Sequence, residues 1–134
     1  MFVDANIFLR HLVNEGTDES ARATALFEQV AEGSRTVWTT WVALAEVVYM
    51  LSSKKVYDVP RRRVADLLSA IVSITGIDLP DKAILPRVFQ LYASLPIDFP
   101  DAYHAALIEH RHETELLSFD HDFDRIPTLT RREP

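Results

Sequence analysis

The sequence predicts an α/β protein, a three-layer α/β/α sandwich with a short-stranded, mainly parallel central sheet. Short apolar or β-rich runs alternate with helical patterns along the 134 residues. Parallel strands are joined by crossovers that are usually helical, so this alternation is typical of a sheet with helices on both faces. No repeat or long linker interrupts the chain, and its length suits one domain, so we expect a single domain over residues 1–134.

The first half of the chain contains two expected strands and three expected helices. Their order is strand 2–3, a helix from residue 7, helix 20–32, strand 36–39 and helix 40–50. We expect Asp18 or Ser20 to cap the second helix and Thr40 to cap the third. Each of these side chains carries an oxygen that can accept a hydrogen bond from a free N–H group of the first helical turn.

The second half continues the alternation. Its expected order is helix 60–75, strand 77–79, helix 83–95, helix 101–110, strand 115–119 and a short strand at 128–129. Pro60 suits the start of a helix, and Pro86 falls in a first turn, where the missing N–H group costs little.

Composition and charge exclude several classes of protein. Hydrophobic residues make up 48% and charged residues 25%, and no apolar run approaches the ~18–20 residues needed to cross a bilayer. The N-terminus lacks the features of a signal peptide, so we expect a cytoplasmic protein without a membrane segment. The absence of cysteine excludes disulfides, thiolate zinc sites and thiol nucleophiles. The net charge of −6 argues against a nucleic-acid partner unless several acids hold metal ions.

Two aspartates follow expected strands directly. Asp4 ends the first strand and Asp120 ends the strand at 115–119. Ligands of open α/β sheets bind beyond the carboxyl ends of the strands, so both side chains are placed to meet there. Taken singly, each aspartate is explained more simply as a turn or N-cap residue.

Glu46 is an acid within an apolar helical pattern. Its neighbours one turn away are all apolar, namely Val42, Ala43, Tyr49 and Met50. We therefore expect its carboxylate to point along a buried stripe, where an isolated charge is unfavourable unless it is paired or coordinated. A salt bridge to Lys54, Lys55 or an arginine is the alternative.

Asp101 opens an apolar helix, and capping by Asp98 or by Asp101 itself is an equally simple explanation. The acids are informative as a set, because several oxygens without cysteine or a histidine cluster suit a hard cation such as Mg²⁺ or Mn²⁺. Residues 61–63, three arginines at a helix start, either contact phosphate or form a solvated face.

Four segments together resemble the motifs of the PIN-domain family. They are residues 2–9, 41–46, 101–106 and 117–124, which keep the order and context of that family over essentially the whole chain. By this resemblance the acidic active-site and metal-binding positions are Asp4, Glu46, Asp101 and Asp120. Asn6 and Ser118 take polar positions that orient Asp4 or a ligand water, and Asp98 and Asp122 stay open as further metal contacts.

The resemblance also implies an activity and partners. Stand-alone PIN domains of this length are similar to VapC toxins, which are Mg²⁺- or Mn²⁺-dependent endoribonucleases that cleave RNA phosphodiesters with a metal-activated water. It implies a homodimer and a VapB-like antitoxin of a type II toxin–antitoxin pair. The apolar positions of residues 64–72 exceed what one core-facing stripe needs, which also favours a homodimer through helices 20–32 and 60–75.

Two other interpretations stay open. One is a Mg²⁺-dependent phosphohydrolase with Asp4 as covalent nucleophile, although such chemistry normally uses a lysine near the phosphoryl group and no lysine of this chain ends a strand. The other is a non-catalytic PIN-like module that binds RNA or a partner; the presence of all four acids argues against it. No phosphate-binding glycine loop and no serine nucleophile elbow is present.

Overall fold

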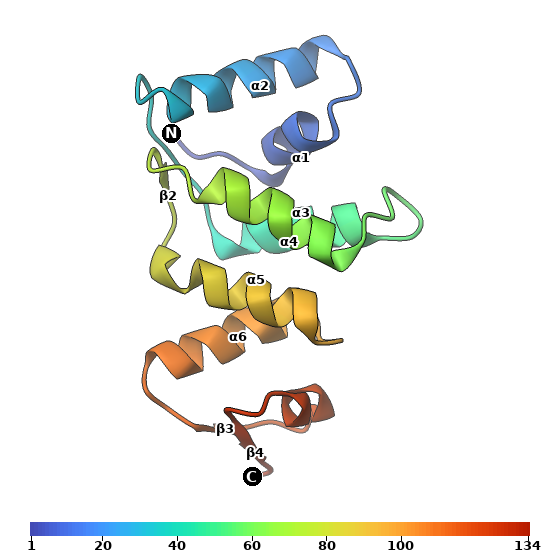
Figure 1. The fold of residues 1–134 in the computed structure, drawn as a ribbon, viewed down its shortest axis with the longest axis vertical. Helices are drawn as coiled ribbons and strands as arrows, with labels where there is room; N and C mark the ends of the chain where they lie inside the picture. Colours follow the sequence, from blue (N-terminus) through green and yellow to red (C-terminus); the bar gives the residue numbers. More distant parts are fainter. The chain divides into compact units, whose positions relative to one another are not determined.

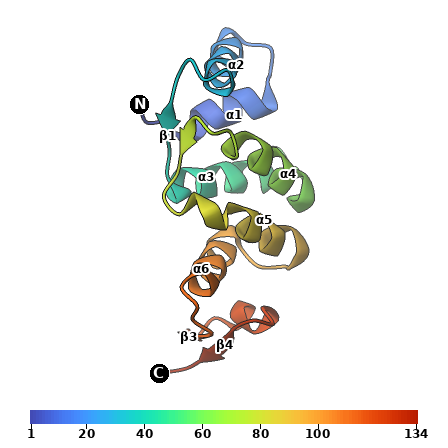
Figure 2. The ribbon, with the colours of Figure 1, turned by 60° about the vertical axis from the view of Figure 1, so that its left-hand side comes forward.

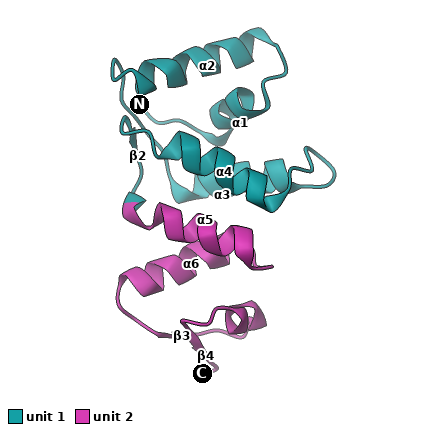
Figure 3. Ribbon diagram, in the orientation of Figure 1, with its two compact units in different colours: residues 1–82 teal, residues 83–134 magenta.

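The computed structural model describes residues 1–134, which divide into two compact units. Unit 1 comprises residues 1–82 and unit 2 comprises residues 83–134, coloured teal and magenta in Figure 3. That the whole chain forms a single domain stays a prediction.

Unit 1 is built around three short parallel segments of backbone. β1 (Val37–Trp38) pairs in parallel with β2 (Ile77–Asp78), and Phe2 forms a parallel bridge with Trp38 on the other side of β1. The amide of Val3 donates to the carbonyl of Trp38 at 2.9 Å, which holds the N-terminal segment beside β1 (Figure 2). The strands expected at residues 2–3, 36–39 and 77–79 are therefore present in unit 1, but each is shorter than the segment predicted from the sequence.

Four helices accompany these strands in unit 1. They are α1 (Ala5–Val13), α2 (Asp18–Ala31), α3 (Trp41–Ser52) and α4 (Arg61–Val72) (Figure 1). Thr40 caps α3 as expected, because its hydroxyl accepts from the amide of Ala43 at 3.2 Å. The expected cap of α2 is wrong: Thr17 has the extended backbone and accepts from the amide of Ser20 at 3.2 Å, so Asp18 and Ser20 lie inside the helix.

The core of unit 1 draws apolar side chains from every helix. Those almost without exposure include Phe8, Val30, Leu44, Val47, Leu51, Val64, Leu68, Val72 and Ile77. Burial of each large aliphatic side chain contributes about 1.5–3 kcal/mol relative to exposure, so this core, rather than two-residue strands, holds unit 1 together.

Unit 2 places two helices before a second pair of parallel strands. Its elements are α5 (Leu85–Ser94), α6 (Phe99–His110), β3 (Glu115–Leu117), the 3₁₀ helix η2 (His121–Arg125) and β4 (Thr130–Arg132), and the 3₁₀ turn η1 (Lys82–Ile84) leads into α5. β3 and β4 pair in parallel with Leu116 opposite Arg131. The strand expected at 128–129 lies two residues later, because the amide of Leu129 instead donates to the carbonyl of Ile126 in a turn.

The α/β class predicted from the sequence is confirmed, with six α-helices and short strands that all pair in parallel. α6 starts two residues earlier than expected, since Pro100 is accommodated in its first turn. No helix has both the length and the apolar character needed to span a bilayer.

Candidate metal centre

Three aspartates of unit 2 bring their carboxylates together. Asp101, Asp120 and Asp122 each offer an oxygen, and these oxygens lie within 4.8 Å of one another. Asp101 comes from the first turn of α6, while Asp120 and Asp122 come from the start of η2, which contacts α6. Two of the four acids singled out from the sequence are therefore neighbours, and Asp122, which the sequence left open, is the third member.

Asp101 is held at the third position of α6 and is half-buried. Burial raises the pKa of its carboxyl, and the charges of Asp120, Asp98 and Asp122 raise it further, while His104 opposes them. Asp101 is not the helix cap, because Asp98 occupies that position, although without a side-chain capping bond. The side chain of Asp101 is thus left to face the other acids.

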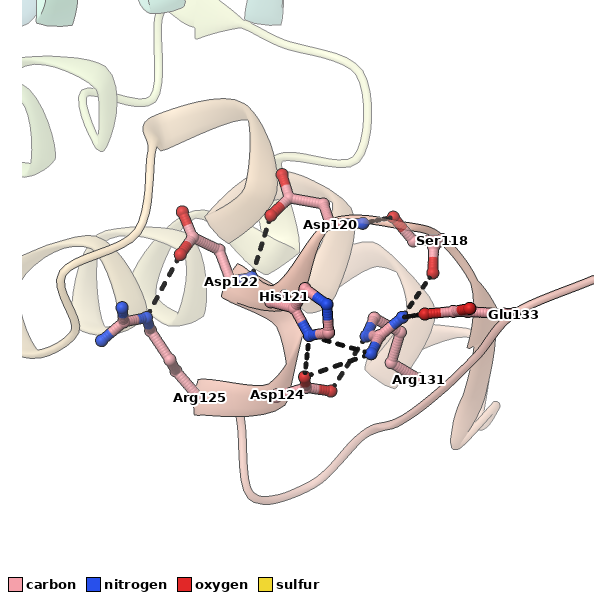
Figure 4. A network of polar contacts seen from close by, with 8 residues as sticks. All are labelled: Ser118, Asp120, His121, Asp122, Asp124, Arg125, Arg131 and Glu133. Carbon is pink, nitrogen blue, oxygen red and sulfur yellow. Dashed lines mark hydrogen bonds and ion pairs between the residues drawn. The ribbon is translucent and has the colours of Figure 1, made fainter.

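Asp120 is oriented by one hydrogen bond from its backbone amide and one to its side-chain carboxylate. Its amide donates to the hydroxyl of Ser118 at 2.9 Å, and its Oδ1 accepts from the amide of Asp122 at 2.9 Å (Figure 4). The structure therefore gives Ser118 a contact with the backbone of Asp120. Asp122 is half-buried, and its Oδ1 accepts from Nε of Arg125 at 3.2 Å.

Arg131 anchors the segment that carries these two aspartates. Only 10% of its side chain is exposed, and its Nη1 donates to the carbonyl of Ser118 at 2.8 Å (Figure 4). Its Nε donates to Asp124 at 3.0 Å, and hydrogen bonds from Arg131 and His121 lower the pKa of Asp124. Asp124 is therefore engaged by Arg131 and His121 and is not one of the three clustered acids. Nothing in the sequence singled out Arg131, which belongs to no motif.

Asp4 and Asn6 lie at the start of α1 in unit 1. Asp4 is exposed, and its Oδ1 caps α1 by accepting from the amide of Ile7 at 3.3 Å. The capping role considered for a lone aspartate is therefore present, and it engages only one carboxylate oxygen. Asn6 is exposed and lines a hollow with Arg10 between α1 and α2, and it makes no hydrogen bond to Asp4.

The expectation that Glu46 points along a buried stripe is wrong. Glu46 is exposed on α3, and its helical neighbours Val42 and Tyr49 are 79% and 70% exposed. The buried face of α3 is the opposite one, formed by Ala43, Leu44, Val47, Val48 and Leu51. Because α3 is apolar nearly all round, its sequence could not indicate which face packs inward. Glu46 makes no ion pair with Lys54 or Lys55, so the alternative explanation is not seen either.

The donor set of unit 2 fits a hard divalent cation. All three groups are carboxylates, as Mg²⁺ and Mn²⁺ prefer, and no cysteine or histidine belongs to the group. Burial and then the neighbouring acids raise the pKa of Asp101, and a bound cation would relieve the repulsion among these acids. Neither Asp101 nor Asp120 forms an ion pair with a lysine or arginine, so the group of three acids could hold a metal ion.

Comparison with known proteins places the chain in a family. The profile of the PIN domain matches residues 1–129, nearly the whole sequence, and this span includes every acid discussed above. No curated protein matches the chain significantly. PIN domains have the fold of metal-dependent nucleases, in agreement with the α/β class and the acidic group. The chain belongs to the PIN domain family.

Proposed function

We propose that the chain is a Mg²⁺- or Mn²⁺-dependent endoribonuclease that acts as the toxin of a type II toxin–antitoxin pair. The observation that carries the proposal is the group of carboxylates from Asp101, Asp120 and Asp122 in a chain of the PIN domain family. Such a cluster in a nuclease fold supports hydrolysis of phosphodiesters assisted by a divalent cation.

The three acids would hold the cation, and the surrounding residues would keep them in position. A bound Mg²⁺ or Mn²⁺ supplies neutralisation of the scissile phosphate and a lower pKa for a coordinated water. Ser118 and Arg131 hold the backbone that leads into Asp120. This support allows the carboxylates to stay close together despite their mutual repulsion.

Asp4 and Glu46 are proposed to be required for the same activity. The proposal rests on their places in the first two motifs, and it is supported by their exposure, since neither carboxylate is engaged in an ion pair. Replacing either residue by its amide should abolish most of the cleavage without unfolding unit 1, because neither side chain contributes to the core.

The partners proposed are an RNA substrate, a second copy of the chain and a VapB-like antitoxin. Of the apolar positions in residues 64–72, Val64, Leu68, Ile71 and Val72 are buried, which leaves Leu67 half-buried and Ala70 exposed. This small remainder adds little to the case for a homodimer. The homodimer and the antitoxin are proposed on the family resemblance alone. Light scattering at micromolar concentration tests the dimer, and a mass corresponding to one chain would contradict it.

Cleavage of a mixed pool of structured RNA by the purified chain tests the nuclease. Cleavage should require Mn²⁺ or Mg²⁺ and stop in EDTA, and Asp101→Asn or Asp120→Asn should slow it by ~10²-fold or more, since each change removes a charged ligand. Asp66→Asn is a matched control, because Asp66 is exposed on α4 and makes no ion pair. Undiminished cleavage in EDTA or in Asp101→Asn would contradict the proposal.

A further inference from the structure

We propose that the basic segment 54–63 of unit 1, which joins α3 to α4, binds the phosphate backbone of single-stranded RNA. The proposal rests on the proposed function for the identity of the polyanion, and on the charges and geometry of unit 1 for the surface. Its positive residues are Lys54, Lys55, Arg61, Arg62 and Arg63.

Positive charge is concentrated in this segment. Five of the 14 lysines and arginines fall within residues 54–63, whereas only one of the 20 acids, Asp58, does. The rest of the chain is strongly acidic, since the whole carries a net charge of −6. A polyanion approaching the protein is therefore attracted to the basic segment and repelled by most other surfaces of the chain.

Four cations of the basic segment, Lys54, Lys55, Arg62 and Arg63, are also available, whereas most others of the chain are engaged. Seven arginines elsewhere form ion pairs with acids, namely Arg10, Arg22, Arg87, Arg111, Arg125, Arg131 and Arg132. Lys82 donates to the carbonyls of Ile74 and Ile77. Lys54, Lys55, Arg62 and Arg63 are exposed and form no ion pair. Free charges of one sign repel one another, so their concentration here indicates an external anion.

The backbone holds the two halves of the basic segment together. The amide of Val59 donates to the carbonyl of Leu51 at 2.8 Å, so the loop folds back and α4 starts beside the last turn of α3 (Figure 1). Inside the loop, the amide of Asp58 donates to the carbonyl of Ser53 at 2.9 Å. The lysines of the loop and the arginines of the first turn of α4 therefore belong to one ordered surface.

The start of α4 adds backbone donors to these charges. Pro60 is the N-cap residue and has no side chain that can accept from the first turn, so the first N–H groups of α4 are left uncapped. Such groups, at the positive end of the helix dipole, bind phosphate oxygens well. Combined with four free cations, they form a surface that suits several phosphates rather than a single ion.

The chemistry of the surface favours RNA over a membrane or an acidic protein. Val56, 46% exposed, is the only large apolar side chain exposed in the segment, which is too little for insertion into a lipid interface. An acidic protein would need apolar or aromatic anchors to dock stably, and the segment offers few. A single-stranded RNA is flexible and carries phosphates at intervals along its backbone. The lysine pair 54–55 and the arginine pair 62–63 can each contact such phosphates without a shaped groove.

Binding of a labelled single-stranded RNA oligonucleotide of mixed sequence, measured in EDTA at several salt concentrations, tests the surface without cleavage. Lys54→Gln/Lys55→Gln and Arg62→Gln/Arg63→Gln should each reduce the slope of log K against log salt by about 1.4, since each phosphate contact contributes ~0.7 for single strands. The same relation predicts affinity about 25-fold lower at 0.1 M salt. Arg22→Gln/Arg111→Gln makes the same change in net charge at two ion-paired, exposed arginines and should leave the slope unchanged.

Several results would overturn the proposal. The first is absence of RNA binding by the wild-type chain in EDTA, and the second is a slope for the two segment variants equal to that of the arginine control. Polyglutamate serves as an acidic polypeptide probe, and the third is that the segment variants keep their binding to RNA but lose binding to polyglutamate. In Mn²⁺, the segment variants should raise KM for RNA and leave kcat within about twofold. If the wild type cleaves nothing, the proposed function fails, while the binding series in EDTA still decides whether the segment holds RNA.

Discussion

Replacing Asp101 by asparagine removes one charge from the acidic group with almost no change of shape. Asp101 is half-buried, and an oxygen of it lies within 4.8 Å of oxygens of both Asp120 and Asp122. If the group exists to hold a cation, the metal-free protein carries uncompensated repulsion there. Asp101→Asn should therefore raise the stability of the metal-free protein and abolish most of the stabilisation by Mn²⁺.

The magnitude follows from the geometry. At 4.8 Å and the dielectric constant of water, two like charges repel by about 0.9 kcal/mol, so relief of two pairs gives roughly 1.7 kcal/mol before salt screening. The dielectric constant of water is appropriate because Asp120 is exposed. Loss of the favourable charge at the start of α6 costs about 0.3–1 kcal/mol. Repulsion is the larger effect, and a net gain of about 1 kcal/mol should raise Tm by roughly 4 °C.

The pH dependence has a defined sign. The pKa of Asp101 is raised in the folded protein, so between its ordinary value near 4 and the raised value the folded state binds more protons than the unfolded state. This contribution to stability is complete below the unfolded pKa and is lost as pH rises through the folded pKa. Asp101→Asn should lack this loss and should gain most over the wild type at neutral pH.

Thermal melts of the wild type, Asp101→Asn and Asp66→Asn, in EDTA and in Mn²⁺, provide the assay. A concentration of Mn²⁺ one hundred times its Kd should stabilise the wild type and Asp66→Asn by about 2.7 kcal/mol, and Asp101→Asn by much less. If Asp101→Asn melts below the wild type in EDTA, or gains as much from Mn²⁺, then Asp101 serves the helix and not a cation.

Two further predictions concern ion pairs of unit 2. Hydrogen bonds from Arg87 lower the pKa of Glu109, so the stability that this pair contributes is present above the unfolded pKa and is lost as pH falls through the lower folded value. Arg87→Gln should therefore reduce the fall of the free energy of unfolding, measured in urea, as pH drops below the ordinary pKa of 4.5. An unchanged pH profile would contradict this. Arg131→Gln should weaken Mn²⁺ binding, measured by calorimetry, by about tenfold to a hundredfold, because Arg131 holds the carbonyl of Ser118. Arg131→Lys should retain part of the affinity for Mn²⁺. Unchanged affinity would exclude a positioning role for Arg131.

Most elements of the fold could be predicted because their signals are local. Thr40 preceding an apolar run predicted the start of α3, and its hydroxyl caps that helix. The cap of α2 was assigned to Asp18 or Ser20, whereas Thr17 holds it. All three side chains can accept from a helical N–H group, and only the backbone conformation distinguishes the cap from the first turn. β4 was misplaced because a strand of three residues is defined by its pairing with β3, which is a distant contact.

The candidate site was predictable where an acid follows a strand or opens a helix. Asp101 and Asp120 satisfied that pattern and are neighbours in unit 2. The membership of Asp122 depends on the tight 3₁₀ turn that Asp120 caps, and the role of Arg131 depends on the register of β4; neither has a local signal. The burial of Glu46 was predicted wrongly because an apolar pattern covering most of a helix does not identify its inner face.

Anomalous diffraction from crystals of the wild-type chain grown with Mn²⁺ tests the central claim most directly. We expect a manganese peak in unit 2 within about 2.5 Å of carboxylate oxygens of Asp101 and Asp120, with Asp122 binding directly or through water. The peak should be absent from crystals of Asp101→Asn grown under the same conditions. The contrary result would be wild-type crystals that contain no manganese at these aspartates, although the Mn²⁺ concentration is one that supports any cleavage activity. That result would contradict the assignment of a metal centre to Asp101, Asp120 and Asp122.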